Sequence, residues 1–127
     1  MTRHTLAGLI AVACFTLAYG RDARAHHSSA MYDIKQLVTI RGVIKEFRWT
    51  NPHVSMIIDT DATEKGRNER WVVEATSPGN LSRSGWRRTS LNAGDRVAVV
   101  AAPLRDGAHG GYCESVTLVD KGKRLEC

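Results

Sequence analysis

Hydrophobic and polar residues alternate with a period of two in several short stretches of the chain. In one of them, Val54, Met56 and Ile58 share one face, while Ser55 and Ile57 share the other. Side chains alternate between the two faces of a β-strand, so each stretch predicts one strand with a core-facing side. The predicted strands cover residues 37–49, 54–59, 70–76, 96–101 and 112–119.

The first stretch changes its alternation in the middle, at Gly42. Ile40 belongs to one face, whereas Val43, Phe47 and Trp49 continue on the other. A glycine at a change of face is typical of a β-bulge or a sharp bend, which small barrels need at their corners. We therefore expect a long first strand that is bent at Gly42.

A short helix is predicted between the third and fourth strands. Ser77 is a helix N-cap residue, Pro78 suits the first turn, and Gly85 supplies a stop, so the helix covers residues 78–84 and carries Leu81. After the fifth strand, the chain is expected to turn and end in a short tail. Three strands, one helix and two strands in this order predict an all-β fold, a small five-stranded OB-like Greek-key barrel. A small β-sandwich is the alternative.

The first 25 residues have the pattern of a secretory signal peptide. Arg3 and His4 open a polar segment, a short apolar run reaches Tyr19, and Ala23-Arg24-Ala25 is a small-x-small cleavage site. The run is shorter than the roughly 20 apolar residues of a membrane-spanning helix, although an uncleaved anchor is the alternative. We expect residues 1–25 to be the signal peptide and residues 26–127 a single periplasmic or secreted domain, without membrane contact after cleavage.

The net charge is +5 for the whole chain and falls to +3 when Arg3, Arg21, Arg24 and Asp22 leave with the signal peptide. This mild excess is spread along the chain and forms no run of Lys or Arg, so it is typical of an ordinary solvated surface. We expect no nucleic-acid partner.

Two cysteines remain after the predicted cleavage, Cys113 and Cys127. In an exported domain two cysteines more often pair than stay free, so a disulfide between the last long strand and the C-terminal tail is expected. A free or intermolecular thiol is the alternative. Bridged cysteines are unavailable as metal ligands.

The predicted cleavage makes His26 the first residue of the mature chain. An N-terminal histidine offers one metal its α-amine and its own Nδ1, and a second imidazole completes three nitrogens in the arrangement called a histidine brace. Nitrogen ligands in tetragonal geometry suit Cu(II). His53, which leaves the Asn51-Pro52 turn on the face opposite the apolar residues of its strand, is the predicted second imidazole. The sequence thus predicts a copper site.

Other residues compete with these ligands or support them. His27 competes with His53, but neighbouring residues of an extended arm point apart. His109, in a Gly-rich loop, is a possible extra ligand or a solvated loop residue. Glu74, on the neighbouring predicted strand, is placed to orient an imidazole as an acceptor, or is a plain surface residue. No catalytic motif is present, so an enzyme is the less favoured interpretation.

A metal-free interaction module is the alternative function. OB-type barrels bind oligosaccharides and single strands on the face of their second and third strands. Arg48 and Trp49 would then form part of a face for a glycan, a peptide or a periplasmic protein. The copper site needs a free amine at His26, whereas this alternative is indifferent to residues added before it.

The chain carries several short motifs at characteristic spacings: Ala25-His26-His27-Ser28, Thr50-Asn51-Pro52-His53, Ser77-Pro78-x-x-Leu81 with Gly85-Trp86, Leu91-x-x-Gly94-Asp95 and Pro103-Leu104-x-Asp106-Gly107. Together these motifs resemble a family of small exported bacterial proteins classed as a domain of unknown function. The resemblance covers nearly all of the mature chain and implies a periplasmic protein with a compact β-barrel. It implies no established activity, substrate or cofactor. Within the motifs, only His26, His27 and His53 are histidines that are able to ligate a metal.

Overall fold

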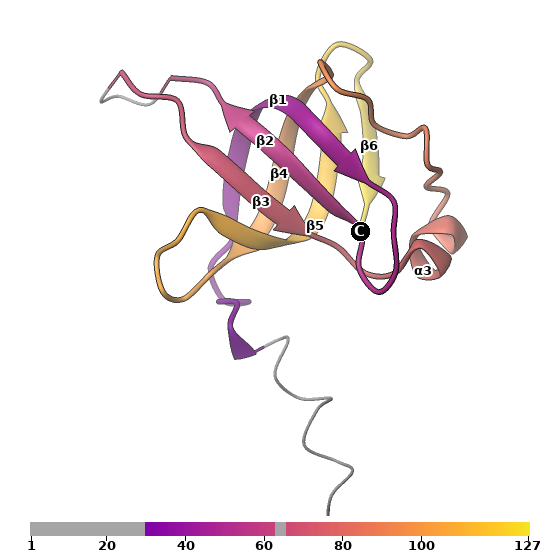
Figure 1. Ribbon diagram of the computed structural model, residues 1–127, viewed down its shortest axis with the longest axis horizontal. Helices are drawn as coiled ribbons and strands as arrows, with labels where there is room; N and C mark the ends of the chain where they lie inside the picture. Colours follow the sequence, from indigo (N-terminus) through magenta and orange to yellow (C-terminus); the bar gives the residue numbers. More distant parts are fainter. Residues whose placement is uncertain (1–29, 63–65) are drawn as a thin grey trace, which may run out of the picture. The chain divides into compact units, whose positions relative to one another are not determined.

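The structure is a computed structural model that describes residues 30–62 and 66–127. The described residues form six strands and a short helix (Figure 1). The elements are β1 (Val38–Arg48), β2 (Ser55–Thr60), β3 (Arg70–Glu74), α3 (Pro78–Arg83), β4 (Arg96–Pro103), β5 (Gly110–Leu118) and β6 (Lys123–Glu126).

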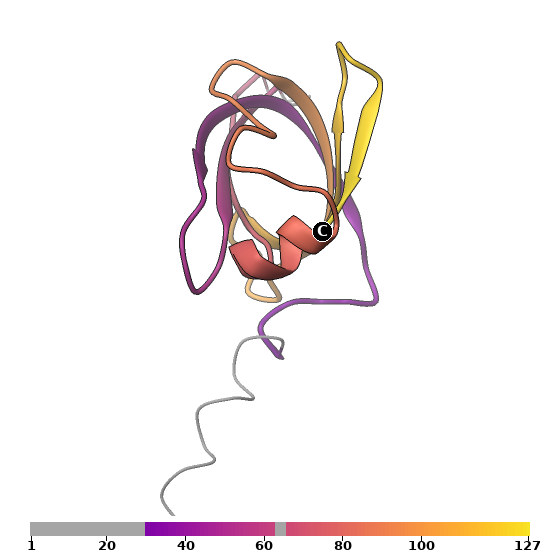
Figure 2. The ribbon, with the colours of Figure 1, turned by 90° about the vertical axis from the view of Figure 1, so that its right-hand side faces the viewer.

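Five of the strands close into a barrel. β1 pairs antiparallel with both β2 and β4, β2 pairs with β3, and β4 pairs with β5. A parallel pairing between β3 and β5 joins the two ends of the sheet, and the strands enclose one interior (Figures 1 and 2). This is the strand order of an OB-like barrel, so the predicted fold class is confirmed.

The core is built from the inward faces that the alternation predicts. On β2 and just before it, Val54, Met56 and Ile58 are fully buried, whereas Ser55 and Ile57 are only partly buried. The same alternation supplies inward residues from the other strands of the barrel. These residues are Ile40, Ile44, Val73, Ala75, Val97, Val99, Ala101, Val116 and Leu118.

A bulge at Gly42, one of the two predicted irregularities, is wrong, as is the change of the core-facing side there. The other, a bend, falls where β1 passes from its pairing with β4 to its pairing with β2, at Gly42 and Val43. Ile44 is 1% exposed and Val43 is only partly buried, so the inward face of the strand continues past Gly42. The irregularity lies at Lys45, because Ile44 pairs with Ile58 while Glu46 already pairs with Ile57. Gly42 is needed for a different reason: a Cβ there would clash with the backbone of β2 at Asp59.

The helix α3 forms where the sequence predicts it and lies across one end of the barrel (Figure 2). The Ser77 hydroxyl accepts a hydrogen bond from the Asn80 amide at 3.3 Å, which caps the first turn. Gly85 has a φ of +87°, a left-handed conformation that favours glycine and ends the helix. Leu81 is fully buried and closes the core at this end.

The expected C-terminal tail is a strand. β6 pairs antiparallel with the second half of β5, and Leu125 is buried against the core. A disulfide joins Cys113 to Cys127, with the Cα atoms 5.7 Å apart, and ties the end of the chain to β5. The short, charged stretch gave too little alternation to predict this strand.

No helix among residues 30–62 and 66–127 is long and apolar enough to cross a membrane. The predicted signal peptide, residues 1–25, lies outside the described residues, as do His26 and His27.

Candidate functional site

His53 stands at the point where the β1–β2 loop returns to the barrel. The next residue, Val54, is held between two backbone hydrogen bonds: its amide donates to the Thr76 carbonyl at 3.1 Å, and its carbonyl accepts from the Ala75 amide at 2.8 Å. The side chain of Val54 is buried, so that of His53 is directed to the outer face. The imidazole is 42% exposed.

Glu74, the last residue of β3, faces this imidazole. Glu74 pairs with Ser55 in the sheet, which makes it a diagonal neighbour of His53 on the outer face. The Nδ1 atom of His53 lies 3.6 Å from Oε2 of Glu74. The contact is longer than a hydrogen bond, but it directs Nδ1 toward the carboxylate and leaves Nε2 on the opposite side of the ring.

A tyrosine completes this cluster. The Tyr32 hydroxyl donates a hydrogen bond of 3.1 Å to the same Glu74 oxygen, and its ring packs on Tyr112 with 5.6 Å between centroids. Tyr32 is only 6% exposed. Burial, and after it the charge of Glu74 and the hydrogen bond to it, raises the pKa of Tyr32 to about 12. The hydroxyl therefore stays protonated and remains a donor to the carboxylate at neutral pH.

The backbone also holds Tyr32 in place. The segment that precedes β1 forms an antiparallel bridge between Tyr32 and Leu104, beyond the end of β4. The Asp33 amide donates to the Pro103 carbonyl at 2.8 Å, and the Arg105 amide donates to the Met31 carbonyl at 2.9 Å. This N-terminal arm, residues 31–36, is thus docked beside His53 by both backbone and side-chain contacts.

A second histidine and glutamate meet at the other end of β3. Nε2 of His109 lies 3.5 Å from Oε2 of Glu69, and its ring stacks on Trp71 with 5.4 Å between centroids. Glu69 and Glu74 are five residues apart along a strand, a distance of about 16 Å. The structure therefore does not bring His109 next to His53.

The two residues of the predicted alternative face have different roles. Nε and the terminal nitrogen Nη2 of Arg48 donate hydrogen bonds to the Glu46 carboxylate, at 2.7 and 2.8 Å. Trp49 is half-buried, and its ring lies 5.9 Å from that of Phe47. Arg48 is thus paired with Glu46, whereas the side chain of Trp49 packs against an aromatic neighbour.

Within the part of the chain that the structure describes, no group of three or more His, Cys, Asp or Glu side chains is arranged to hold a metal ion. His53 and Glu74 lie together, and the remaining predicted ligands, His26 and His27, are outside the described residues.

The role of Tyr32 was not predicted from the sequence. The residue is 42 positions from Glu74, so no local pattern joins the two. A large aromatic residue in an otherwise irregular polar arm was the available signal, because such a side chain usually packs against something.

Comparison with known proteins identifies both a family and a fold. The model of a family described as "Family of unknown function (DUF6152)" matches residues 13–113. A solved structure of the mitochondrial single-stranded DNA binding protein Rim1 of S. cerevisiae is similar with a TM-score of 0.51 and 14% identity. That similarity covers 66% of this chain and 93% of the other, and at this identity it shows the fold alone. No curated protein matches the chain significantly.

Proposed function

The chain belongs to the family DUF6152, and we propose that its mature form is an exported copper-binding protein whose site joins His26 to His53. Cleavage after Ala25 would make His26 the N-terminal residue. Its α-amine and Nδ1 would then chelate the metal, and His53 would supply the third nitrogen. The protein would serve in metal handling or in accessory electron chemistry, in the periplasm or outside the cell.

The observation that carries the proposal is the contact between Tyr32 and Glu74 beside His53. Tyr32 is fixed at 3.1 Å from the carboxylate, which in turn lies 3.6 Å from the imidazole. His26 precedes Tyr32 by six residues, and six residues span at most about 20 Å. A chain of this length would allow the proposed N-terminal ligand to reach His53, and the short tether would raise its effective concentration there.

The geometry of His53 also suits the proposed ligand set. Glu74 faces Nδ1, so Nε2 is the nitrogen that remains for a metal. A carboxylate behind a ligating imidazole orients the ring and raises its basicity. Two imidazoles and an amine form a nitrogen-rich set that favours Cu(II) over the other divalent first-row metals. An unperturbed α-amine has a pKa near 8, so copper displaces its proton readily at neutral pH.

The test compares two preparations in a Cu(II) titration followed by EPR. Both preparations carry His27→Ala, because a glycine placed before His26 would make His27 the third residue, where the amine, two backbone amides and its imidazole would bind Cu(II) by themselves. One preparation begins at His26, and the other carries a single glycine before it, which moves the free amine away from the His26 imidazole. We expect tight binding and a nitrogen-rich axial spectrum for the first preparation. We expect much weaker binding for the second, because the amine and Nδ1 no longer chelate from one residue.

The unaltered chain that begins at His26 is the control for His27→Ala. The substitution removes a histidine from the same segment but leaves the His26 amine and imidazole intact, so the spectrum is expected to be the same with and without it. Equal copper affinity with and without the added glycine would rule out the proposed site.

A further inference from the structure

A hollow of about 220 Å³ lies between the end of β1 and the segment that follows α3. It is lined by Trp49, Ser82, Gly85, Trp86, Arg87 and Arg88. Drug-sized ligands occupy pockets of about 300–1,000 Å³, so this one has room for little more than a single ring.

The hollow carries unneutralised positive charge. Arg87 and Arg88 are both exposed, and neither side chain has an ion pair among residues 30–62 and 66–127. Two carboxylates of the adjoining strands are paired with other arginines. Glu46 pairs with Arg48 at 2.7 Å, and Glu126 pairs with Arg124 at 2.6 Å. Two consecutive arginines that line one hollow without acidic partners among the described residues favour an anionic ligand.

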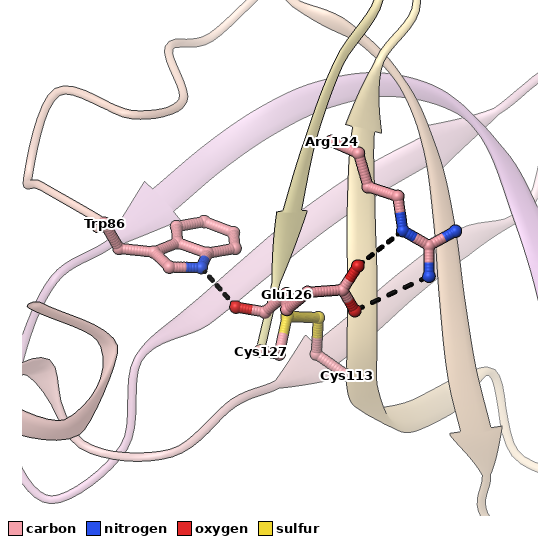
Figure 3. Close-up of polar contacts among 5 residues, drawn as sticks. All are labelled: Trp86, Cys113, Arg124, Glu126 and Cys127. Carbon is pink, nitrogen blue, oxygen red and sulfur yellow. Dashed lines mark hydrogen bonds and ion pairs between the residues drawn. A yellow bond between two sulfur atoms is a disulfide. The ribbon is translucent and has the colours of Figure 1, made fainter. Parts of the chain in front are cut away.

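One wall of the hollow is fixed in position. Trp86 is 1% exposed, and its indole Nε1 donates a hydrogen bond of 2.7 Å to the carbonyl of Glu126 (Figure 3). The next residue, Cys127, is bonded to Cys113, so the acceptor of this hydrogen bond is tied to β5 (Figure 3). A wall held in this way loses little conformational freedom when a ligand binds.

The hollow also has an aromatic lining residue that is packed against the core. The ring of Phe47 contacts both tryptophans, with centroids 5.9 Å from Trp49 and 6.1 Å from Trp86. Trp49 is half-buried and lines the hollow, so its indole offers an apolar surface on which a ring of a ligand is able to pack.

We propose that this hollow binds a small ring that carries a carboxylate, such as a uronic-acid sugar. Arg87 and Arg88 bind the carboxylate with charge-assisted hydrogen bonds, and Trp49 packs on the face of the ring. The ligand is either a free sugar acid or the terminal unit of an acidic polysaccharide, which share this chemistry. The site uses none of the residues of the proposed copper centre.

The experiment measures binding to the mature protein in the presence of EDTA, by calorimetry and by tryptophan fluorescence. The probes are galacturonate, trigalacturonate, neutral galactose and inorganic phosphate. We expect saturable binding of galacturonate, at least about tenfold weaker binding of galactose because the charged hydrogen bonds are lost, and no comparable binding of phosphate, which lacks a ring. Equal affinity for monomer and trimer assigns the free sugar acid, whereas tighter binding of the trimer assigns the chain end.

Arg87→Gln and Arg88→Gln are each expected to weaken galacturonate binding by about tenfold or more. Arg83→Gln is the matched control, because Arg83 lies on α3 and hydrogen-bonds Asn80 at 2.8 Å outside the hollow. All three positions are exposed, so folding is not at risk. The proposal is overturned if galacturonate does not bind, if galactose or phosphate binds equally well, or if Arg87→Gln and Arg88→Gln behave like Arg83→Gln.

Discussion

Each end of strand β3 carries a histidine beside a glutamate, and the two pairs are nearly alike. His53 lies 3.6 Å from Glu74 at the end of the strand, and His109 lies 3.5 Å from Glu69 just before its start. Both imidazoles are exposed to a similar degree, 42% and 46%. Judged by the histidine and the carboxylate alone, the two sites are equivalent.

The surroundings of the two pairs differ. Trp71 stacks on the ring of His109 with an interplanar angle of 17°, so one face of that imidazole is covered. At the other end, Tyr32 brings the N-terminal arm to Glu74, and this arm continues back to His26. The comparison shows that a histidine and a carboxylate do not define a site. The chain segment that lies beside each histidine–glutamate pair determines which further ligands are available to that pair.

The largest expected effect separates the two histidines. In the preparation that begins at His26, His53→Ala is expected to lower Cu(II) affinity by more than about 100-fold, because loss of an outer-shell partner alone costs about 10–100-fold. His109→Ala is expected to leave the affinity almost unchanged. Competitive titration against a chelator of known affinity measures both. Equal losses of copper affinity in the two variants would contradict the proposed role of His53 as the copper ligand.

The next effect separates the two glutamates. Glu74→Gln keeps the size of the side chain and removes its charge, and we expect it to lower copper affinity by about tenfold, since the carboxylate no longer orients His53. Glu69→Gln is the matched change at the other end of β3 and is expected to have no effect. The same titration reads both variants, and a loss with Glu69→Gln would place the metal at His109.

A smaller effect comes from the docking of the arm. Tyr32→Phe removes the hydroxyl that binds Glu74, and the expected loss is about 1 kcal/mol of unfolding free energy, the typical contribution of one hydrogen bond. Tyr112→Phe is the control, because Tyr112 supplies only its ring to the contact with Tyr32. Urea denaturation measures both, and equal stability of Tyr32→Phe and the unaltered protein would show that the hydrogen bond does not hold the arm.

The subtlest effect is on the titration of Tyr32. Its pKa is about 12, raised by burial and then by Glu74, so its proton is held more tightly in the folded than in the unfolded chain. This contribution to stability is present below pH 10 and is lost as the pH rises toward 12. Glu74→Gln is expected to lower the pKa without restoring 10, because burial remains. Tyrosinate absorbance follows the titration, and an unchanged pKa in Glu74→Gln would show that the carboxylate does not act on Tyr32.

The barrel was predictable because its strands obey simple alternation. The strand β2 is indicated by the alternating apolar residues Val54, Met56 and Ile58. The helix α3 is delimited by Ser77, Pro78 and Gly85, whose local effects on the backbone need no tertiary contact. The order of elements predicted an OB-like barrel, but no residue indicated the pairing of β3 with β5 that closes it. The short β6 was missed because, in Lys123–Glu126, only Leu125 is apolar.

The position of the irregularity in β1 was not predictable from the strand itself. Gly42 looked like the bulge, but it is required by the close approach of Asp59, which belongs to another strand. The bulge instead falls at Lys45, where the register against β2 shifts by one residue. Both facts depend on the partner strand.

The candidate site was predictable only in part. The alternation placed His53 and Glu74 on the outer faces of neighbouring strands, and the two side chains lie together there. It gave no reason to connect Tyr32 with Glu74, because that contact depends on how the arm meets the end of β4. The N-terminal arm is irregular and contacts residues distant in the sequence, so no periodic pattern predicts where it docks.

A crystal structure of the mature protein soaked with Cu(II), with anomalous data collected at the copper edge, tests the proposed copper site. We expect one strong anomalous peak bonded to the α-amine and Nδ1 of His26 and to Nε2 of His53, with Glu74 behind the His53 ring. A peak at His109, or none within bonding distance of His53, would contradict it.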